Sequence, residues 1–140
     1  MTRVIRTALR CVVWVALVLG ASLGLAQDME QVKVVFEHAI PNIQNKKMVS
    51  VLVTYPPGAK SLPHHHAPSS FVYAYVVSGA IRTKVGEEPT KIYNAGESFY
   101  EAPGSFHRIS ENASDKDPAT LLAVFIVDLK DAPLTIPDQK

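Results

Sequence analysis

Short runs of apolar and β-branched residues, separated by polar turns, make up most of this 140-residue chain. Within them, apolar and polar positions alternate or apolar positions are continuous, and both patterns predict β-strands. The runs lie at residues 31–36, 48–55, 71–77, 80–85, 90–93, 98–100, 107–109 and 121–127. Pro, Gly, Asn and Asp separate them, and no segment after residue 26 shows a convincing helical period. The pattern therefore predicts an all-β sandwich or barrel.

The first 26 residues follow a different pattern. Three arginines precede an apolar run at residues 11–26, and small residues stand at positions 24 and 26. This order is typical of a secretory signal peptide that is cleaved after Ala26. The alternative is a retained membrane anchor, although the run is shorter than the ~20 residues that a spanning helix uses. We expect a signal peptide at 1–26 and a single domain at 27–140, in an exported protein that is periplasmic or extracellular.

Composition narrows the function classes. The only Cys and the only Trp lie in the leader, so the mature chain would contain no disulfide. Removing three arginines from 14 basic residues leaves 11 against 13 acidic ones, a net charge of −2. This balance argues against nucleic acid as a partner, and contact with a membrane is expected only through an uncleaved leader.

Three of the five histidines form one tripeptide, His64-His65-His66, directly after Pro63. In an extended segment, residues two apart project from the same side with Cα atoms about 6.5 Å apart. His64 and His66 can therefore converge on one ion while His65 points away. The alternative is a polar loop with solvated imidazoles, and His38 is expected to be solvated or hydrogen-bonded.

Two segments around these histidines resemble the two motifs of the cupin superfamily. Gly58, His64, His66 and Gly79 take positions of the first motif, G-x5-H-x-H-x3,4-E-x6-G. The second motif, G-x5-P-x-G-x2-H-x3-N, is matched at Gly96, Gly104 and His107. The resemblance implies a double-stranded β-helix, the jelly-roll cupin barrel, with His64, His66 and His107 holding one divalent transition metal ion. Imidazole ligands do not distinguish Fe, Mn, Zn, Cu or Ni.

The sequence departs from the first motif at its carboxylate. Counting along the motif reaches Ser70, Phe71 or Val72, and none of them is Glu. The nearest replacement is Glu101, as a fourth metal ligand or as a residue that supports the ligands. The turn that follows Glu101 leaves the direction of its side chain open.

Alternation continued from His64 and His66 predicts which residues face the metal. It gives the pocket an apolar wall of Val72, Ala74 and Val76. The residues that alternate with this wall would form an outer row that packs on a second sheet or on the other subunit of a homodimer: Phe71, Tyr73, Tyr75 and Val77. Ser78-Gly79 then predicts a hairpin into the next strand.

These residues leave three functional hypotheses open. The first is a small-molecule metalloenzyme of dioxygenase-like or isomerase-like type, because three protein ligands leave coordination positions for substrate. The second is a non-catalytic barrel that binds a small ligand or the metal, and the missing carboxylate favours it. The third is a barrel with an empty histidine cluster. No residue identifies the substrate.

If the leader is cleaved as predicted, the exported protein begins at Gln27. Intact-mass measurement of the protein recovered from its compartment checks this. A mass that still includes Trp14 would instead indicate an anchored protein.

Overall fold

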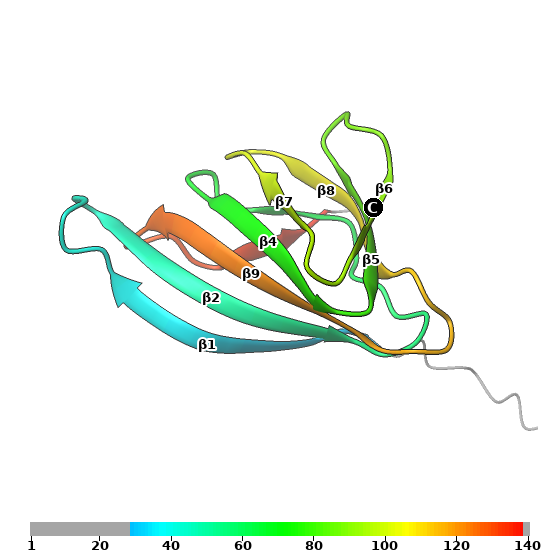
Figure 1. Cartoon of the computed structure of the whole chain (residues 1–140). Coiled ribbons are helices and arrows are strands. Elements are labelled where there is room, and N and C mark those ends of the chain that lie inside the picture. Colours follow the sequence, from blue (N-terminus) through cyan, green and yellow to red (C-terminus); the bar gives the residue numbers. More distant parts are fainter. Residues whose placement is uncertain (1–28, 139–140) are drawn as a thin grey trace, which may run out of the picture.

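Two five-stranded antiparallel sheets build the domain (Figure 1). The computed structural model describes residues 29–138, so the expected signal peptide at 1–26 lies outside the described residues. One sheet has the order β1-β2-β9-β4-β7 and the other the order β10-β3-β8-β5-β6. The strands are β1 (Gln31–Ala39), β2 (Lys46–Tyr55), β3 (His64–His66), β4 (Phe71–Ser78), β5 (Ala80–Val85), β6 (Lys91–Asn94), β7 (Ser98–Glu101), β8 (Phe106–Asn112), β9 (Ala119–Asp128) and β10 (Thr135–Pro137).

The all-β prediction is confirmed, since a strand overlaps every run that the apolar pattern singled out. Two short strands, β3 and β10, were not among those runs. No helix long and apolar enough to cross a membrane occurs between residues 29 and 138.

Period-two alternation decides which side chains form the core. Along β9, every second residue from Ala119 to Val127 is buried and the residues between them are half-buried. β4 follows the same rule, with Val72, Ala74 and Val76 buried. Both strands therefore turn one face toward the opposite sheet, where their side chains leave water.

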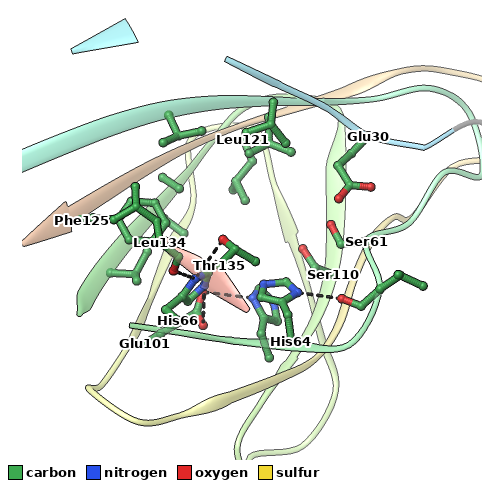
Figure 2. Close-up of a pocket in the computed structure, with 18 of the residues that line it drawn as sticks. Glu30, Ser61, His64, His66, Glu101, Ser110, Leu121, Phe125, Leu134 and Thr135 are labelled. Atoms are coloured by element: carbon green, nitrogen blue, oxygen red, sulfur yellow. Dashed lines mark hydrogen bonds and ion pairs between the residues drawn. The ribbon is translucent and has the colours of Figure 1, made fainter. Parts of the chain in front are cut away.

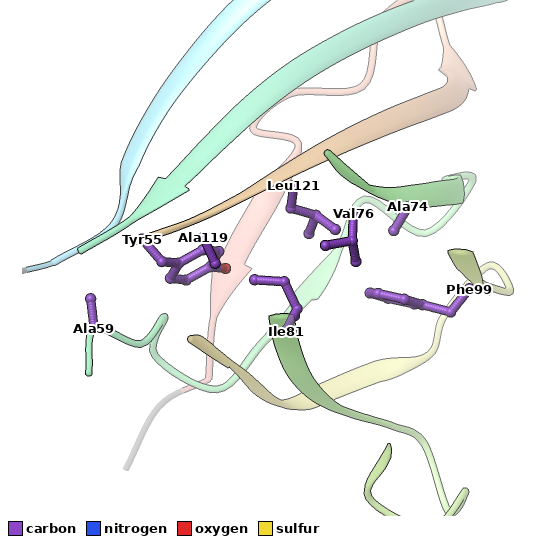
Figure 3. Close-up of a cluster of buried hydrophobic side chains, with 8 residues drawn as sticks. All are labelled: Tyr55, Ala59, Ala74, Val76, Ile81, Phe99, Ala119 and Leu121. Atoms are coloured by element: carbon purple, nitrogen blue, oxygen red, sulfur yellow. The ribbon is translucent and has the colours of Figure 1, made fainter. Parts of the chain in front are cut away.

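Buried side chains close one part of the interior. Figure 3 shows this cluster, in which residues from both sheets and from the loop after β2 meet. Its members are Tyr55, Ala59, Ala74, Val76, Ile81, Phe99, Ala119 and Leu121. A second cluster, with Val49 and Phe125 among its members, packs between β2, β9 and the start of β4.

The predicted hairpin at Ser78-Gly79 is wrong, because β4 and β5 belong to different sheets. Only Gly79 connects them, and its φ of +70° bends the chain from one sheet into the other. A Cβ on Gly79 would lie 2.7 Å from the carbonyl oxygen of Pro118 and 2.8 Å from Ala119. The position therefore requires glycine for its conformation and for the close approach of the β9 backbone.

The outer face of the β1-β2-β9-β4-β7 sheet is largely apolar, and no described segment covers it. Tyr73 lies on β4, opposite Val124 of the central strand β9 on one side and Tyr100 of the edge strand β7 on the other. The predicted outer row is exposed, with Tyr73 at 42% and Phe71 at 40%. The expectation that a second sheet of the chain covers this row is therefore wrong, and cover by another subunit stays a prediction.

The dimensions of this face suit a two-fold interface. Four spacings of about 4.8 Å and strands of up to ten residues give a projected area of roughly 600 Å². Because side chains protrude from the sheet, the accessible area of the face is larger than its projected area and approaches the ~800 Å² per partner that stable interfaces bury. The charged pair Lys46–Asp128 lies at one end of the face, away from its centre.

We expect the protein to form a homodimer through this face. Tyr73→Glu should give a monomer, because two buried carboxylates would face the partner sheet. Sedimentation at micromolar concentration measures the mass. The matched control is Ile92→Glu, at an exposed apolar residue of the other sheet, which should stay dimeric. A wild-type protein that is monomeric at all concentrations would contradict the prediction.

Candidate metal centre

Three histidine side chains meet where β3 and β8 pair. His64 lies directly opposite His107 in the antiparallel register. His64 and His66 are buried, while His65 between them points outward to the carboxylate of Asp138 at 2.9 Å. One ring nitrogen from each of His64, His66 and His107 can be chosen so that all three lie within 4.8 Å of one another.

A second contact orients each of these rings. Nδ1 of His64 donates to the carbonyl oxygen of Leu62 at 2.7 Å, and Nδ1 of His66 donates to that of Leu134 at 3.1 Å. Nε2 of His107 lies 2.7 Å from the hydroxyl of Thr83. Such contacts fix the ring plane and the tautomer of a metal-ligating histidine. Nε2 of His64 and of His66 is thereby left with a free lone pair.

Glu101 faces these rings from the other sheet (Figure 2). Its Oε1 lies 3.1 Å from Nδ1 of His107, and its Oε2 lies 3.4 Å from Nε2 of His66. The residue is 3% exposed, and Oε2 has no hydrogen-bond partner among the described residues. Four potential ligands, three imidazoles and one carboxylate, are thus grouped in a buried site.

The position of Glu101 explains how the chain manages without the first-motif carboxylate. Val72, which stands where one count of that motif expects Glu, pairs in register with Glu101 across β4 and β7. Side chains that are paired in this way have Cβ atoms about 5 Å apart on the same face. A carboxylate thus points into the site from β7, on the strand next to the motif position.

Burial keeps the His64 imidazole neutral, and contacts with two histidines keep the Glu101 carboxyl ionised. The pKa of His64 is lowered from 6.5 to about 4, mainly by desolvation and also by the neighbouring His107 and His66, against the opposing effects of the hydrogen bond to Leu62 and of Glu101. For Glu101, burial alone would raise the pKa, but contacts with His107 and His66 outweigh burial and lower it to about 2. Near neutral pH, both groups are in the form that binds a cation.

The site fits a divalent ion on chemical grounds. Because Nδ1 of His66 donates to a backbone carbonyl, a neutral ring presents a lone pair at Nε2, and that lone pair faces Oε2 of Glu101. Two acceptors at 3.4 Å need a cation between them, either a proton or a metal. Nitrogen ligands about 2.1 Å from one ion are at most ~4.2 Å apart, so the rings would draw in by some tenths of an ångström.

An apolar cavity of about 340 Å³ adjoins the three buried histidines and Glu101. Its walls come mainly from β2, β4 and β9, with Val72 and Ala74 among the lining residues. Val76, the third residue of the predicted wall, does not line the cavity, because it packs against Ile81 and Leu121 in the closed part of the interior. His38 is exposed on β1 and contacts the carbonyl oxygen of its neighbour Ala39.

Some residues of the site were not found from the sequence. Leu134 contributes a backbone carbonyl, which leaves no trace in a sequence pattern. Thr83 could have been noticed as a polar residue at an inward position of β5. The cavity is also lined by Glu30, Tyr55, Ser61 and Ser110. No sequence pattern distinguished these four residues.

Solved structures with the same fold were found, at low sequence identity. An uncharacterised conserved protein with a double-stranded β-helix domain from Klebsiella pneumoniae is 20% identical, with a TM-score of 0.61 over 80% of this chain and 86% of that one. KdgF from Halomonas sp. is 20% identical, with a TM-score of 0.55 over 74% of this chain and 84% of that chain. TT1209 from Thermus thermophilus is 27% identical, with a TM-score of 0.51 and 65% and 83% of the two chains covered.

The low pKa of His64 predicts that the metal-free protein loses stability on mild acidification. An unfolded histidine titrates near 6.5 and the folded one near 4, so the unfolded chain binds more protons between these values. The free energy of unfolding should therefore fall as pH drops from 6.5 toward 4, by about 3 kcal/mol in total. Glu101 extends the same trend to lower pH, where its carboxylate is protonated.

Urea unfolding at a series of pH values, with chelator present, measures this loss. The slope between pH 6.5 and 4 should be smaller in His64→Gln and unchanged in the half-exposed control His65→Gln. Equal slopes in the wild type and in His64→Gln would contradict the assignment.

The family comparison agrees with the fold and with the histidine site. No curated protein matches the chain. The model of the family described as "Cupin domain" matches residues 51–125, just over half of the sequence. That segment begins within β2, ends within β9 and contains His64, His66, Glu101 and His107. The double-stranded β-helix and this family match together show that the chain belongs to the cupin family.

Proposed function

We propose that this protein is an exported metalloenzyme that binds one divalent transition metal ion and a small organic molecule in the same cavity. The observation that carries the proposal is the lone pair of His66 Nε2 facing the unpartnered Oε2 of Glu101, beside two further buried imidazoles. His64, His66 and His107 would hold the ion. Glu101 is the proposed fourth ligand, which replaces the first-motif carboxylate.

A bound divalent ion would supply Lewis acidity toward a substrate oxygen or a site for O2, the chemistry of isomerase-like and dioxygenase-like enzymes respectively. The residues of the protein would position the metal ligands. Leu62 and Leu134 hold two rings in place through their carbonyl oxygens, so the ligands need little reorganisation. The single negative charge of Glu101 leaves the loaded site with a net positive charge, which favours an anionic oxygen as the incoming ligand.

The apolar wall directs a substrate toward the ion. Leu121, Ala123 and Phe125 of β9 line the cavity on one side, and the rings of Phe125 and His66 pack in a T-shaped arrangement with centroids 5.0 Å apart. Water is a poor competitor in such surroundings, and electrostatic interactions are stronger there. A molecule with a carbon frame and an oxygen donor fits this cavity better than a strongly charged one.

Metal binding should require the inward-facing histidines and not the other two. In Ala variants we expect loss of the ion at His64, His66 and His107, and retention at His65 and His38. Glu101→Gln should weaken binding by about 10- to 100-fold, since one charged contact is lost while the volume is kept. Elemental analysis of purified protein and Co(II) titration measure both effects. Equal loss in all five histidine variants would indicate a loose histidine cluster in place of a defined site.

Turnover separates an enzyme from a non-catalytic binding barrel. Mass spectrometry can identify a small molecule that co-purifies with the metal-loaded protein and can follow it during incubation in air. A chemical change that His107→Ala abolishes supports the enzyme. A compound that stays unchanged and is merely released with the metal supports the binding barrel.

A further inference from the structure

The cavity has a second polar region besides the metal-binding side chains. Tyr55, Ser61 and Ser110 contribute hydroxyl groups to it, and Glu30 contributes a carboxylate. Figure 2 shows Glu30, Ser61 and Ser110 on one side of the cavity and Glu101 with His66 on the other. These four residues lie outside the ligand set, so their polarity needs a separate explanation.

The three hydroxyl groups form a short chain. The phenol oxygen of Tyr55 lies 2.8 Å from Ser61 Oγ and 2.8 Å from Ser110 Oγ. Three hydroxyls carry three protons, and two hydrogen bonds use two of them. One O–H donor is therefore left for another acceptor. Burial raises the pKa of Tyr55, so its phenol keeps its proton near neutral pH.

Glu30 adds a carboxylate, a hydrogen-bond acceptor, to the lining of the same cavity. It immediately precedes β1, which forms one side of the cavity through Val32 and Val34. Its Oε2 atom is buried and has no hydrogen-bond partner among residues 29–138. A buried carboxylate oxygen without a donor is costly, and each such atom in a native structure calls for an explanation.

A purely structural role accounts for only part of this arrangement. Tyr55 is a core residue whose hydroxyl needs a partner, and the two serines satisfy it. That role requires neither the spare O–H nor an unpaired carboxylate beside the same cavity. A ligand hydroxyl uses both, because it donates to Glu30 and accepts from the hydroxyl chain. An ammonium group could only donate.

We propose that Glu30, Tyr55, Ser61 and Ser110 form a subsite for a hydroxyl group of the substrate. The ligand class that follows is a small hydroxylated acid, with an oxygen donor for the metal, a short apolar frame, and a hydroxyl at the far end. This inference rests on the proposed metal-dependent binding of a small molecule. It adds a specificity determinant from residues outside the two histidine motifs.

The probes are a homologous series of ω-hydroxy carboxylates and the unsubstituted carboxylates of the same length. Binding to the Co(II)-loaded protein is followed by the metal spectrum, which reports occupancy without turnover. At the chain length that spans the cavity, the hydroxy acid should bind about tenfold more tightly than its unsubstituted partner, as expected for recovered hydrogen bonds. Glu30→Gln and Tyr55→Phe should each reduce this preference.

Matched controls are Glu37→Gln and Tyr73→Phe, whose side chains lie outside the cavity and should leave the preference unchanged. Glu30→Gln should also unfold at the same temperature as the wild type or at a higher one, because it replaces a carboxyl group whose buried Oε2 has no hydrogen-bond donor among residues 29–138. A lower melting temperature would show that Glu30 has a structural partner and would overturn the subsite.

The outcomes separate this inference from the proposed function. If unsubstituted carboxylates perturb the Co(II) spectrum but the hydroxyl adds no affinity at any length, the subsite is wrong and the metal site stands. An unchanged hydroxyl preference in both Glu30→Gln and Tyr55→Phe also overturns the subsite. If no carboxylate reaches the ion, the proposed function fails and the subsite fails with it.

Discussion

Burial of imidazole and carboxylate side chains inside an apolar barrel is the constraint on which the rest of this structure depends. Imidazole and carboxylate groups lose hydration in such a place, and each needs a compensating contact. The chain meets this need mainly through backbone carbonyls of Leu62 and Leu134 and through the hydroxyl of Thr83. These contacts leave the remaining ring nitrogens and Glu101 facing one another, so the unsatisfied part of the arrangement is concentrated where a cation fits.

The carboxylate shows how a fold can preserve a site while its sequence motif changes. In an antiparallel sheet, the residue directly opposite a given position shares its face and most of its surroundings. Val72 and Glu101 are such a pair, so exchanging the acidic residue between β4 and β7 keeps its charge near His66 and His107. A motif read along one strand cannot detect this exchange, because the two positions are 29 residues apart.

The same apolar surroundings divide the interior into a packed part and an open part. Ile81 and Phe99 fill one region, whereas small or β-branched residues such as Ala123 and Val51 leave space near the histidines. Alternation makes all of these positions inward-facing, and side-chain volume then decides whether the interior is filled or open. Val76 shares the face of Ala74 and packs against Ile81 and Leu121 in the packed part, whereas Ala74 also borders the cavity.

The sequence by itself determined eight of the ten strands, the all-β class, the inward direction of His64 and His66, and the outward direction of His65, because period-two alternation is a local property of an extended chain. Only the tertiary structure decided which sheet each strand joins. Gly79 shows this. The sequence predicts a hairpin at this position, but the chain crosses there from one sheet to the other, close to Ala119. Glu101, Leu134 and Glu30 likewise gained their roles from strand pairing and loop placement. These depend on contacts between residues far apart in the chain, which no local pattern encodes.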